Sequence, residues 1–446
     1  MLRPSTAHAE LGPRFFDIVA SASFPMAVPR YRNQPWAERI GLGGLSEAQW
    51  IEHFARFSPL PGCFAEPLCL RYHGHQFRHY NPDLGDGRGF LFAQLHDQED
   101  GRLLDLGTKG SGTTPYSRGG DGRLTLKGGV REVLATELLA ALGVDTSKSF
   151  SLVETGESLQ RNDEPSPTRS CVLVRLSHSH IRIGTFQRFA HLGDDDAIDV
   201  LVRHTIRHYM PGLWSDDAGA RAERLFRRVA ENCARLAASW MAAGFVHGVL
   251  NTDNINVTGE SFDYGPWRFL PVLDPKFTAA YFDHAGLYAY GRQPATLNWN
   301  LARLAECLLP LAPVERLQPV LEEFQDLYQQ ALLAAVYRRL GMRGGSIDSV
   351  RAIFDFLRDT RMPFERFFYD AYAGGRVEGI DIAGEPLPGT SREHDYFARG
   401  RPCTMLIDEV EALWAPIAAR DDWSVFAAKL AEIRLLADAT KQQSGG

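Results

Sequence analysis

The chain has 446 residues, 44% of them hydrophobic and 23% charged, which is typical of a globular protein and excludes a wholly disordered chain. Lysine and arginine number 48, aspartate and glutamate number 55, and the net charge of −7 argues against binding nucleic acid through its phosphates. No uncharged apolar run approaches the ~20 residues that a membrane-spanning helix needs, so we expect neither a nucleic acid nor a membrane as a partner.

Short apolar runs and a concentration of glycines characterise the first 190 residues. The runs predict strands at 90–95, 103–109, 149–155 and 171–176. Apolar residues at helical spacing predict a helix over 129–142, with Gly143 as its stop signal. The glycines lie mainly between residues 81 and 129, where they indicate turns and a close approach of the backbone to another group.

Amphipathic helices dominate the chain from about residue 195 onward. We predict helices at 196–210, 219–243, 298–311, 314–340, 346–358, 404–418 and 422–439. A long loop at 374–402 and a frayed tail at 441–446 complete this part. These patterns predict an α+β fold in two parts: a strand-rich part at 1–190 that includes an N-terminal extension, and a mainly helical part at 191–446.

A polar stretch interrupts the helical part between residues 245 and 265. Asn251, Asp253, Asn254 and Asp263 lie there among apolar residues. One interpretation is a pair of Asx turns between short strands. The other is a magnesium site, because one amide oxygen and one carboxylate suffice when a substrate supplies phosphates.

The order of residues in this stretch is typical of kinase-like folds. In such folds a catalytic loop ends in a metal-binding asparagine, and a later Asp-aromatic-Gly supplies the second ligand. Asn254 and Asp263 fill these two positions, but Val249 stands where the catalytic aspartate is expected. Asp253 is the nearby carboxylate that could take over as the general base.

A kinase-like fold also needs a lysine on a strand and a glutamate on the following helix. Lys109 lies at the end of the second predicted strand, and Glu132 and Glu137 lie on the next predicted helix. Glu137 falls near the apolar side, where an unpaired carboxylate is costly, so periodicity favours a partner for Glu137. Periodicity does not decide which of the two pairs with the lysine.

Two glycine motifs and two arginines could contact phosphates. Gly85, Gly87 and Arg88 belong to one motif and Asp121 and Gly122 to the other, and either motif can offer backbone N–H groups to an anion. A hairpin turn explains each motif equally well. Arg175 and Arg182 stand in apolar surroundings, so each either pairs with a carboxylate or clamps a terminal phosphate.

Eight sequence blocks together resemble the selenoprotein O family, also called the YdiU family, over roughly residues 70–311. They are GHQF (74–77), LGDGR (84–88), KGSGTTPYSRGGDGR (109–123), REVLATELLAALGV (131–144), SHIRIGTFQ (179–187), GFVHGVLNTDNINVTGESFDYGPWRFLPVLDP (244–275), YAYGRQP (288–294) and WNLARLAECLLPL (299–311). By eye, the first 60 residues and those after about 340 match weakly. The resemblance implies a protein-kinase-like, two-lobed pseudokinase fold that binds ATP in a reversed orientation.

The resemblance also implies an activity: transfer of AMP from ATP to Ser, Thr or Tyr hydroxyls of proteins, with Mg²⁺ or Mn²⁺ as the metal. It implies that Asp253 is the general base and that Asn254 and Asp263 hold the metal. The residues implied to contact ATP or to support that contact are Gly85, Gly87, Arg88, Lys109, Asp121, Gly122, Glu132, Arg175, Arg182 and Asp263.

Two other functions stay open at this point. One is a phosphotransferase that uses Asp253 as its base, and the other is a nucleotide-binding pseudokinase that acts through protein contacts. The scattered cysteines and the lack of an apolar leader predict a cytoplasmic location. Some family members pair a C-terminal cysteine with one after the metal aspartate; neither 275–283 nor 441–446 contains a cysteine, so we do not expect that redox switch.

Overall fold

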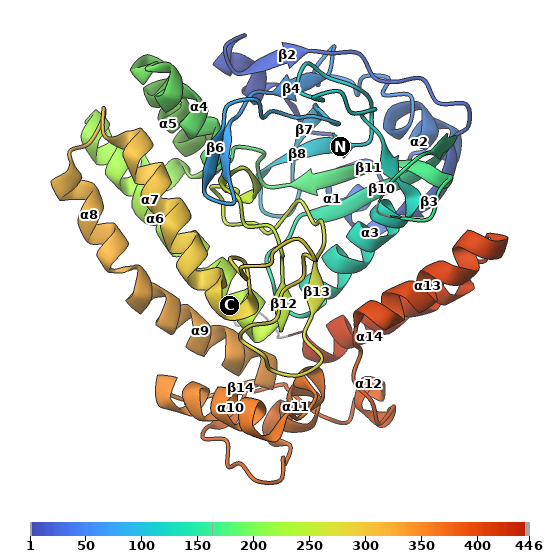
Figure 1. The fold of residues 1–446 in the computed structure, drawn as a ribbon, viewed down its shortest axis with the longest axis vertical. Helices are drawn as coiled ribbons and strands as arrows, with labels where there is room; N and C mark the ends of the chain where they lie inside the picture. The colour runs from blue at the N-terminus through green and yellow to red at the C-terminus, as the bar shows by residue number, and fades with distance from the viewer. Residues whose placement is uncertain (1, 163, 442–446) are drawn as a thin grey trace.

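A large antiparallel sheet organises the first part of the computed structural model, which describes residues 2–162 and 164–441 (Figure 1). The sheet has nine strands, whose central order is β2-β4-β7-β8-β11-β10-β3, with β1 added to β7 and β9 to β11. Its strands are β1 (Pro4–Ser5), β2 (Phe16–Ile18), β3 (Val28–Arg32), β4 (Leu68–Leu70), β7 (Leu91–His96), β8 (Leu103–Lys109), β9 (Leu124–Thr125), β10 (Lys148–Leu159) and β11 (Thr168–Ser177).

The central strands are covered on both faces, which explains their continuous apolar runs. All seven residues of β8 are buried. On one face, helix α3 (Leu126–Ala141) packs against residues such as Leu152 and Leu173. On the other face, Trp50 and Phe54 of helix α2 (Glu47–Phe54) pack against Phe150. A strand buried on both faces loses the alternation of polar and apolar residues, so the four predicted strands are confirmed as β7, β8, β10 and β11.

Helix α3 lies close against the sheet because a glycine faces it. A Cβ atom added at Gly129 would lie 2.5 Å from Leu152 Cδ1 and 2.7 Å from Cys171 Sγ. The helix begins at Leu126, earlier than predicted, because the Thr125 side chain accepts a hydrogen bond from the Gly128 N–H at 3.1 Å and caps it.

The rest of the chain is mainly helical. Besides α1 (Gln34–Arg39) and α2 (Glu47–Phe54), the helices are α4 (Ile183–Leu192), α5 (Asp195–Tyr209), α6 (Ala218–Ala242), α7 (Gln293–Leu308), α8 (Val314–Glu322), α9 (Phe324–Leu340), α10 (Ile347–Thr360), α11 (Phe364–Ala371), α12 (Asp395–Ala398), α13 (Ile407–Arg420) and α14 (Ser424–Thr440). The helix predicted at 314–340 is two helices. Pro319, which cannot donate a backbone hydrogen bond, weakens the chain one turn before the break at Glu323.

Short strands outside the large sheet form three small pairs. They are β5 (Gly74–Gln76) with β6 (His79–Asn81), β12 (Phe245–Val246) with β13 (Arg268–Phe269), and β14 (Met342–Arg343) with β15 (Glu385–Pro386). The first pair is a hairpin that reaches the polar stretch, because the His75 N–H donates to Thr252 Oγ1 at 2.7 Å.

The N-terminal residues contribute three strands to the large sheet. Strand β3 pairs with β10, β2 pairs with β4, and β1 pairs with β7. These strands have only two to five residues, which is too short for a recognisable alternation. The N-terminal extension stays a prediction, because these strands do not decide where a lobe begins.

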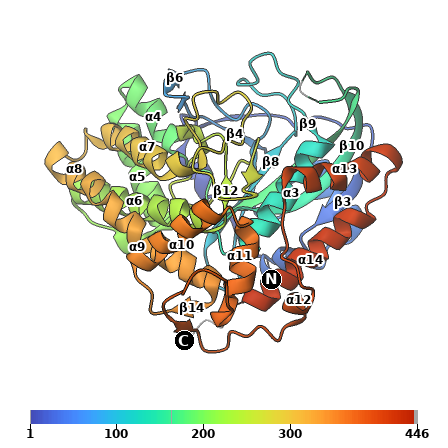
Figure 2. The same ribbon diagram turned by 60° about the horizontal axis from the view of Figure 1, so that its bottom comes forward.

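The last two helices return to the sheet and lie beside α3 (Figures 1 and 2). Lys127 Nζ of α3 lies 2.8 Å from Glu411 Oε2 of α13, and Asp421, between the two helices, pairs with Arg30 at 3.0 Å and Arg169 at 2.7 Å. The predicted helices at 404–418 and 422–439 are thus confirmed, and they support the strand-rich part. The division between residues 190 and 191 stays a prediction.

Two general expectations can be compared with the structure. All six cysteines are free, and all except the half-buried Cys63 are buried. Within 2–162 and 164–441, no helix combines the length and apolar character needed to cross a bilayer. Of the tail predicted to fray, residues 442–446 lie outside the described part.

Candidate active site

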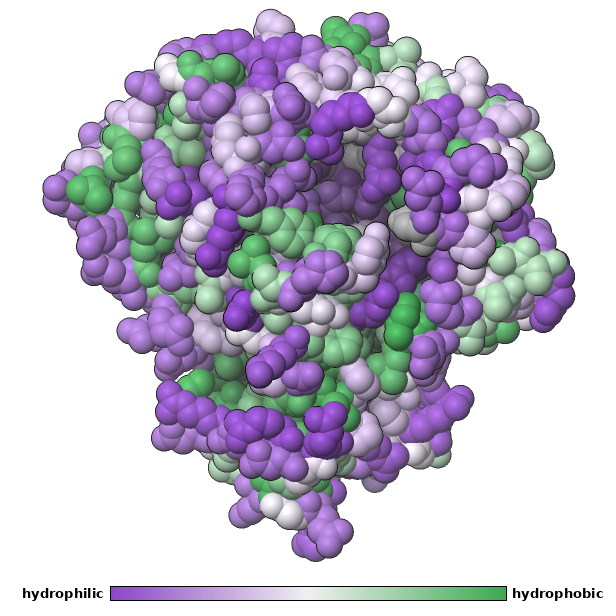
Figure 3. All heavy atoms as spheres, viewed as in Figure 1, coloured by the Kyte–Doolittle hydropathy of each residue, from purple (hydrophilic) through white to green (hydrophobic). Residues whose placement is uncertain are grey.

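One cavity of about 740 Å³ brings together most of the residues selected from the sequence. Its lining includes Gly85, Gly87, Arg88, Lys109, Asp121, Gly122, Arg175, Arg182, Asp253 and Asp263. Glu132 lies behind this lining as the partner of Lys109, and Asn254 is outside it. Figure 3 shows a hollow with hydrophilic walls over this part of the molecule. A volume of this size suits a small-molecule ligand such as a nucleotide.

The lysine at the end of β8 joins the sheet, helix α3 and the polar stretch. Lys109 Nζ lies 2.6 Å from Glu132 Oε2 and 3.0 Å from Asp263 Oδ1. Lys109 and Glu132 are only 6% and 1% exposed, so neither charge is stabilised by water and each depends on the other. Three segments far apart in the sequence are thereby fixed at one point.

The two glutamates of α3 have different partners. Glu137 Oε1 accepts hydrogen bonds from the Tyr31 hydroxyl at 2.7 Å and from Asn33 Nδ2 at 3.3 Å. Periodicity was therefore right that Glu137 has a partner, while Glu132 pairs with Lys109. The partners of Glu137 come from the N-terminal residues, which carried no sequence signal for this contact.

Two buried arginines extend the charged network along the cavity. Arg175 Nη1 lies 3.1 Å from Asp263 Oδ1 and 3.5 Å from Glu132 Oε1. Arg182 Nη1 donates to the main-chain oxygen of Asp253 at 3.0 Å, and its Nη2 lies 3.3 Å from Asp86 Oδ1. Both arginines pair with carboxylates, as one interpretation predicted, and both line the cavity, while the clamping of a phosphate stays a prediction.

Asp253 has an acceptor atom that nothing in the described part of the chain satisfies. The side chain lines the cavity, and its buried Oδ1 has no hydrogen-bond partner there. Burial raises the pKa of Asp253 to about 7, although the charge of Arg182 lowers it. A carboxyl group with such a pKa can accept a proton from a substrate hydroxyl near neutral pH.

The backbone leaves little room around this carboxylate. A Cβ atom added at Gly74, in the β5–β6 hairpin, would lie 2.9 Å from Asp253 Oδ1. The hairpin and the residues before Asp253 are joined by hydrogen bonds from the His75 N–H to Thr252 Oγ1 at 2.7 Å and from the Phe77 N–H to Asn251 Oδ1 at 3.1 Å. These contacts hold Asp253 in place.

Asp263 is held in an ionised state and in an unusual backbone conformation. Burial raises its pKa, but three cations outweigh burial and keep the pKa well below the usual range; these are Lys109, Arg175 and Arg182. Its φ of 61° lies in the left-handed region, which is costly for a residue with a side chain and concentrates at functional sites.

Asn254 and Asp263 each carry an oxygen atom of the kind that a magnesium ion binds. Asn254 Nδ2 donates to the Val249 oxygen at 3.0 Å, and the amide oxygen accepts no hydrogen bond from the described residues. Asp263 contributes an ionised carboxylate that is 24% exposed to the cavity. Across 2–162 and 164–441, no three His, Cys, Asp or Glu side chains form a metal-binding group. Magnesium needs no such group, since water and substrate phosphates supply its other ligands.

The first glycine motif packs against residues 110–117, which lead to the second motif, and neither motif joins two consecutive strands that pair with each other. The Ser117 hydroxyl donates to the Gly87 oxygen at 2.6 Å, and the Gly110 N–H donates to the Arg88 oxygen at 2.7 Å. A Cβ atom added at Gly85 would lie 2.3 Å from the ring of Tyr116. Both motifs line the cavity, as a phosphate cradle requires.

Sequence reasoning missed several residues of this cavity. Asp86 ties Arg182 to the first glycine motif, and burial raises its pKa. Gln76 and Arg118 also line the cavity. Asp86 lies inside the first glycine motif, Arg118 directly precedes the second, and Gln76 lies in the GHQF block, so these patterns were the available signal.

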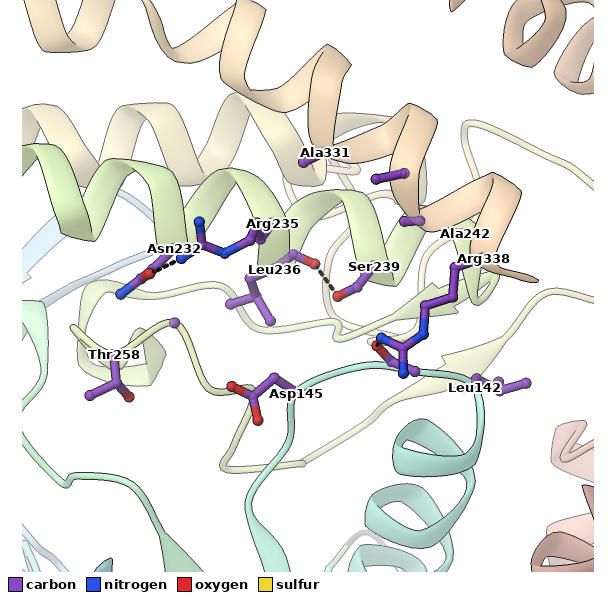
Figure 4. A pocket seen from close by; sticks show the side chains of 14 residues that line it. Leu142, Asp145, Asn232, Arg235, Leu236, Ser239, Ala242, Thr258, Ala331 and Arg338 are labelled. Atoms are coloured by element: carbon purple, nitrogen blue, oxygen red, sulfur yellow. Dashed lines mark hydrogen bonds between the residues drawn. The ribbon is translucent and has the colours of Figure 1, made fainter. Parts of the chain in front are cut away.

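A second cavity, of about 330 Å³, lies between α6, α9 and the chain that follows α3 (Figure 4). Apolar side chains such as Leu142, Leu236 and Ala331 form much of its wall, with Arg235 and Asp145 among the polar residues. None of the residues predicted for catalysis or binding lies in this cavity. The polar cavity at Asp253 is therefore the candidate active site.

Known proteins provide an independent comparison. A sequence model of the family described as "Protein adenylyltransferase SelO" matches residues 2–375, which extends beyond the motif region of 70–311 at both ends. The weak match expected by eye for the first 60 residues was therefore wrong, because short strands without motifs still carry family similarity.

Cyanobacterial relatives agree with this match. The "Protein nucleotidyltransferase YdiU" of Synechocystis sp. is 42% identical over 93% of this chain and 94% of its own length. That of Gloeobacter violaceus is 44% identical over 94% of this chain and 92% of its own length.

Among solved structures, ROP2 from Toxoplasma gondii is described as a virulence factor with a protein-kinase fold and no enzymatic activity. It covers 67% of this chain and 84% of its own, at 12% identity and a TM-score of 0.27, which is too low to carry an argument. The family match and the relatives decide the assignment: this chain belongs to the SelO family of protein adenylyltransferases.

Proposed function

We propose that this chain is a protein adenylyltransferase that transfers AMP from ATP to a Ser, Thr or Tyr hydroxyl of a protein and releases pyrophosphate. Family membership supports a nucleotidyltransferase. The observation that carries the proposal is the candidate active site itself, where an unsatisfied carboxylate oxygen of Asp253 shares a polar cavity with Lys109, Arg175 and Arg182.

The chemistry follows from these groups. The hydroxyl oxygen of the acceptor attacks the α-phosphorus of ATP, a new P–O bond forms, and the bond to the bridging oxygen breaks so that pyrophosphate leaves. Asp253 accepts the hydroxyl proton, which can be worth ~10²–10⁴-fold in rate. Lys109, Arg175 and Arg182 hold the phosphates and offset the negative charge of the leaving pyrophosphate.

Magnesium completes this proposal, and manganese could replace it. Asn254 and Asp263 would hold the ion, which supplies positive charge to the phosphates when bound. Gly85, Gly87 and Arg88 would contact the nucleotide from one glycine motif, and Asp121 and Gly122 from the other. Their places in the lining support these roles. Glu132 acts through Lys109, which it orients.

We further propose a two-lobed, protein-kinase-like layout with a division near residue 190. Two observations support it. Lys109 and Glu132 come from the sheet and its helix, as in a kinase N-terminal lobe, and Asp253 and Asp263 come from the polar stretch after α6. The C-terminal helices that pack on α3 are an addition to that layout.

Labelled ATP tests the proposed function and both alternatives. The full chain is incubated with Mg²⁺, proteins of the native host and ATP labelled at either the α- or the γ-phosphate, and modified proteins are analysed by intact mass. Label from the α-phosphate with the mass of an adenylyl group is expected. Label from the γ-phosphate would indicate a phosphotransferase. Stabilisation by ATP without any label would indicate a binding module.

A further inference from the structure

Two aromatic side chains project into solvent near the candidate active site. Tyr281 is 79% exposed and Phe282 is 43% exposed, and their ring centroids are 5.1 Å apart. We call these two residues the aromatic pair. Large apolar groups exposed side by side are a feature of interaction sites. None of the contacts that form the candidate active site requires either ring.

The aromatic pair is linked to the residues that hold Asp253. The ring of Phe282 lies 5.9 Å from that of Phe77, and Phe77 donates its N–H to Asn251 Oδ1 at 3.1 Å. Gln76, the residue before Phe77, lines the candidate active site. The aromatic pair is therefore one hairpin away from the wall of the cavity that carries Asp253.

The chain before the aromatic pair also contacts the loop that leads to Asp253. A Cβ atom added at Gly248 would lie 2.9 Å from Ala279 Cβ and 3.5 Å from the Ala280 nitrogen. The Tyr288 hydroxyl, which follows the aromatic pair, donates to Asn251 Oδ1 at 2.7 Å. The segment is thus anchored on both sides, and the aromatic pair supplies the large hydrophobic side chains that are exposed between the anchors.

The depth of Asp253 restricts what kind of acceptor can be modified. Asp253 is only 7% exposed, and a general base must come within hydrogen-bond reach of the hydroxyl it deprotonates. A hydroxyl on a flat, folded surface cannot enter that far, whereas one on an extended segment can. The residues that flank such a hydroxyl must then lie over the rim of the cavity, and Figure 3 shows hydrophobic atoms beside the hollow.

We propose that the aromatic pair is a docking surface for the protein acceptor: it binds an aromatic or long aliphatic side chain that flanks the modified hydroxyl in an unfolded segment. This inference rests on the proposed function and adds the class of acceptor. Covering an exposed ring with one apolar side chain corresponds to about tenfold in the efficiency of transfer.

An array of unfolded peptides tests the docking surface. Each peptide carries one Ser, Thr or Tyr flanked by Phe or Leu, and its matched partner has Ala at the flanking positions. The full chain labels the array with α-labelled ATP and Mg²⁺. We expect about tenfold more label on the Phe and Leu peptides. The variant Tyr281→Ser/Phe282→Ser should reduce this preference to less than about twofold, with unchanged stabilisation by ATP.

A matched variant controls for the loss of exposed apolar surface. Leu309 and Val314 are 47% and 49% exposed and lie outside the cavity lining. The variant Leu309→Ser/Val314→Ser should keep the preference of the unchanged chain. Because the aromatic pair is exposed, its replacement should leave the melting temperature unchanged, and a circular dichroism melt verifies this.

Three results would overturn the docking surface. The first is equal labelling of both peptide sets, or no labelling of any peptide, by the unchanged chain. The second is a preference that survives in Tyr281→Ser/Phe282→Ser. The third is a dimer, seen by sedimentation, that this variant dissolves, because a second copy of the chain would then be the occupant. The proposed function fails separately, if α-labelled ATP labels no protein of the native host.

Discussion

Two buried charged clusters in this protein differ in a way that separates structure from function. At Asp105, every acceptor is satisfied: Gln94 Nε2 donates at 2.7 Å, the Tyr209 hydroxyl at 3.2 Å and the His180 N–H at 2.9 Å. At the candidate active site, the charges face a cavity of about 740 Å³ and Asp253 Oδ1 has no partner among the described residues. Burial of charge alone therefore does not indicate a site; an unsatisfied atom that faces open space does.

The largest effect should come from Asp253→Asn. The amide keeps the size of the side chain but cannot accept a proton, so we expect AMP transfer to fall by ~10²–10⁴-fold. Stabilisation by ATP and Mg²⁺ should remain, since the phosphates are held by other residues. Transfer from α-labelled ATP and thermal shifts measure the two quantities. A transfer rate within about threefold of the unchanged chain would remove Asp253 from the role of base.

Asp263→Ala tests the proposed metal ligand of the candidate active site. It removes the carboxylate that faces Lys109 and Arg175 at 3.0 and 3.1 Å. We expect the dependence of ATP binding on Mg²⁺ to disappear and transfer to fall by ~10²-fold or more. Calorimetry with and without Mg²⁺ measures this. If Mg²⁺ strengthened ATP binding in the variant as much as in the unchanged chain, Asp263 would not be a metal ligand.

Asp105→Asn tests whether the satisfied cluster at Asp105 contributes to stability and not to catalysis. The amide retains one acceptor oxygen and turns an N–H₂ group toward donors, so one or more buried hydrogen bonds are lost. We expect the free energy of unfolding to fall by about 1–3 kcal/mol. Urea denaturation measures it. Transfer per folded molecule should stay within about twofold. A loss of transfer equal to that of Asp253→Asn, in a fully folded variant, would contradict the distinction.

The smallest effect concerns Glu260, which is buried within the polar stretch but is not part of the cavity lining. Burial raises its pKa to about 8. The folded state therefore binds the proton more tightly than the unfolded state, so stability is full below pH ~4.5 and declines as the pH rises toward 8.

Glu260→Gln removes this titration. The His178 N–H donates a hydrogen bond to Glu260 Oε2 at 2.8 Å, and the glutamine keeps an oxygen that can accept it. We expect the variant to melt about 2 °C or more above the unchanged chain at pH 9 and to show a smaller difference at pH 5. Melting curves across this range measure the effect. The same difference at both pH values would show that Glu260 does not titrate as proposed.

Prediction from the sequence succeeded for strands whose burial is visible as a run of apolar residues. The strands at 103–109 and 171–176 are buried on both faces, so their apolar runs were unambiguous, and Lys109 and Arg175 could be placed on them. Strands of two to five residues at the N-terminus were missed because they are too short to show a period. Without them, the partners of Glu137 could not be identified.

The sequence alone determined the residue types of the site and the order in which they occur, because motifs such as those around Gly85, Lys109 and Asp263 are local and survive divergence elsewhere. Only the tertiary structure decided which residues pair with Glu137 and which carboxylate oxygen is left without a partner. It also showed that α13 and α14 pack on α3 and that the aromatic pair contacts Phe77 of the hairpin next to Asp253. The physical reason is that such pairings depend on contacts between segments far apart in the chain, and no local periodicity records them.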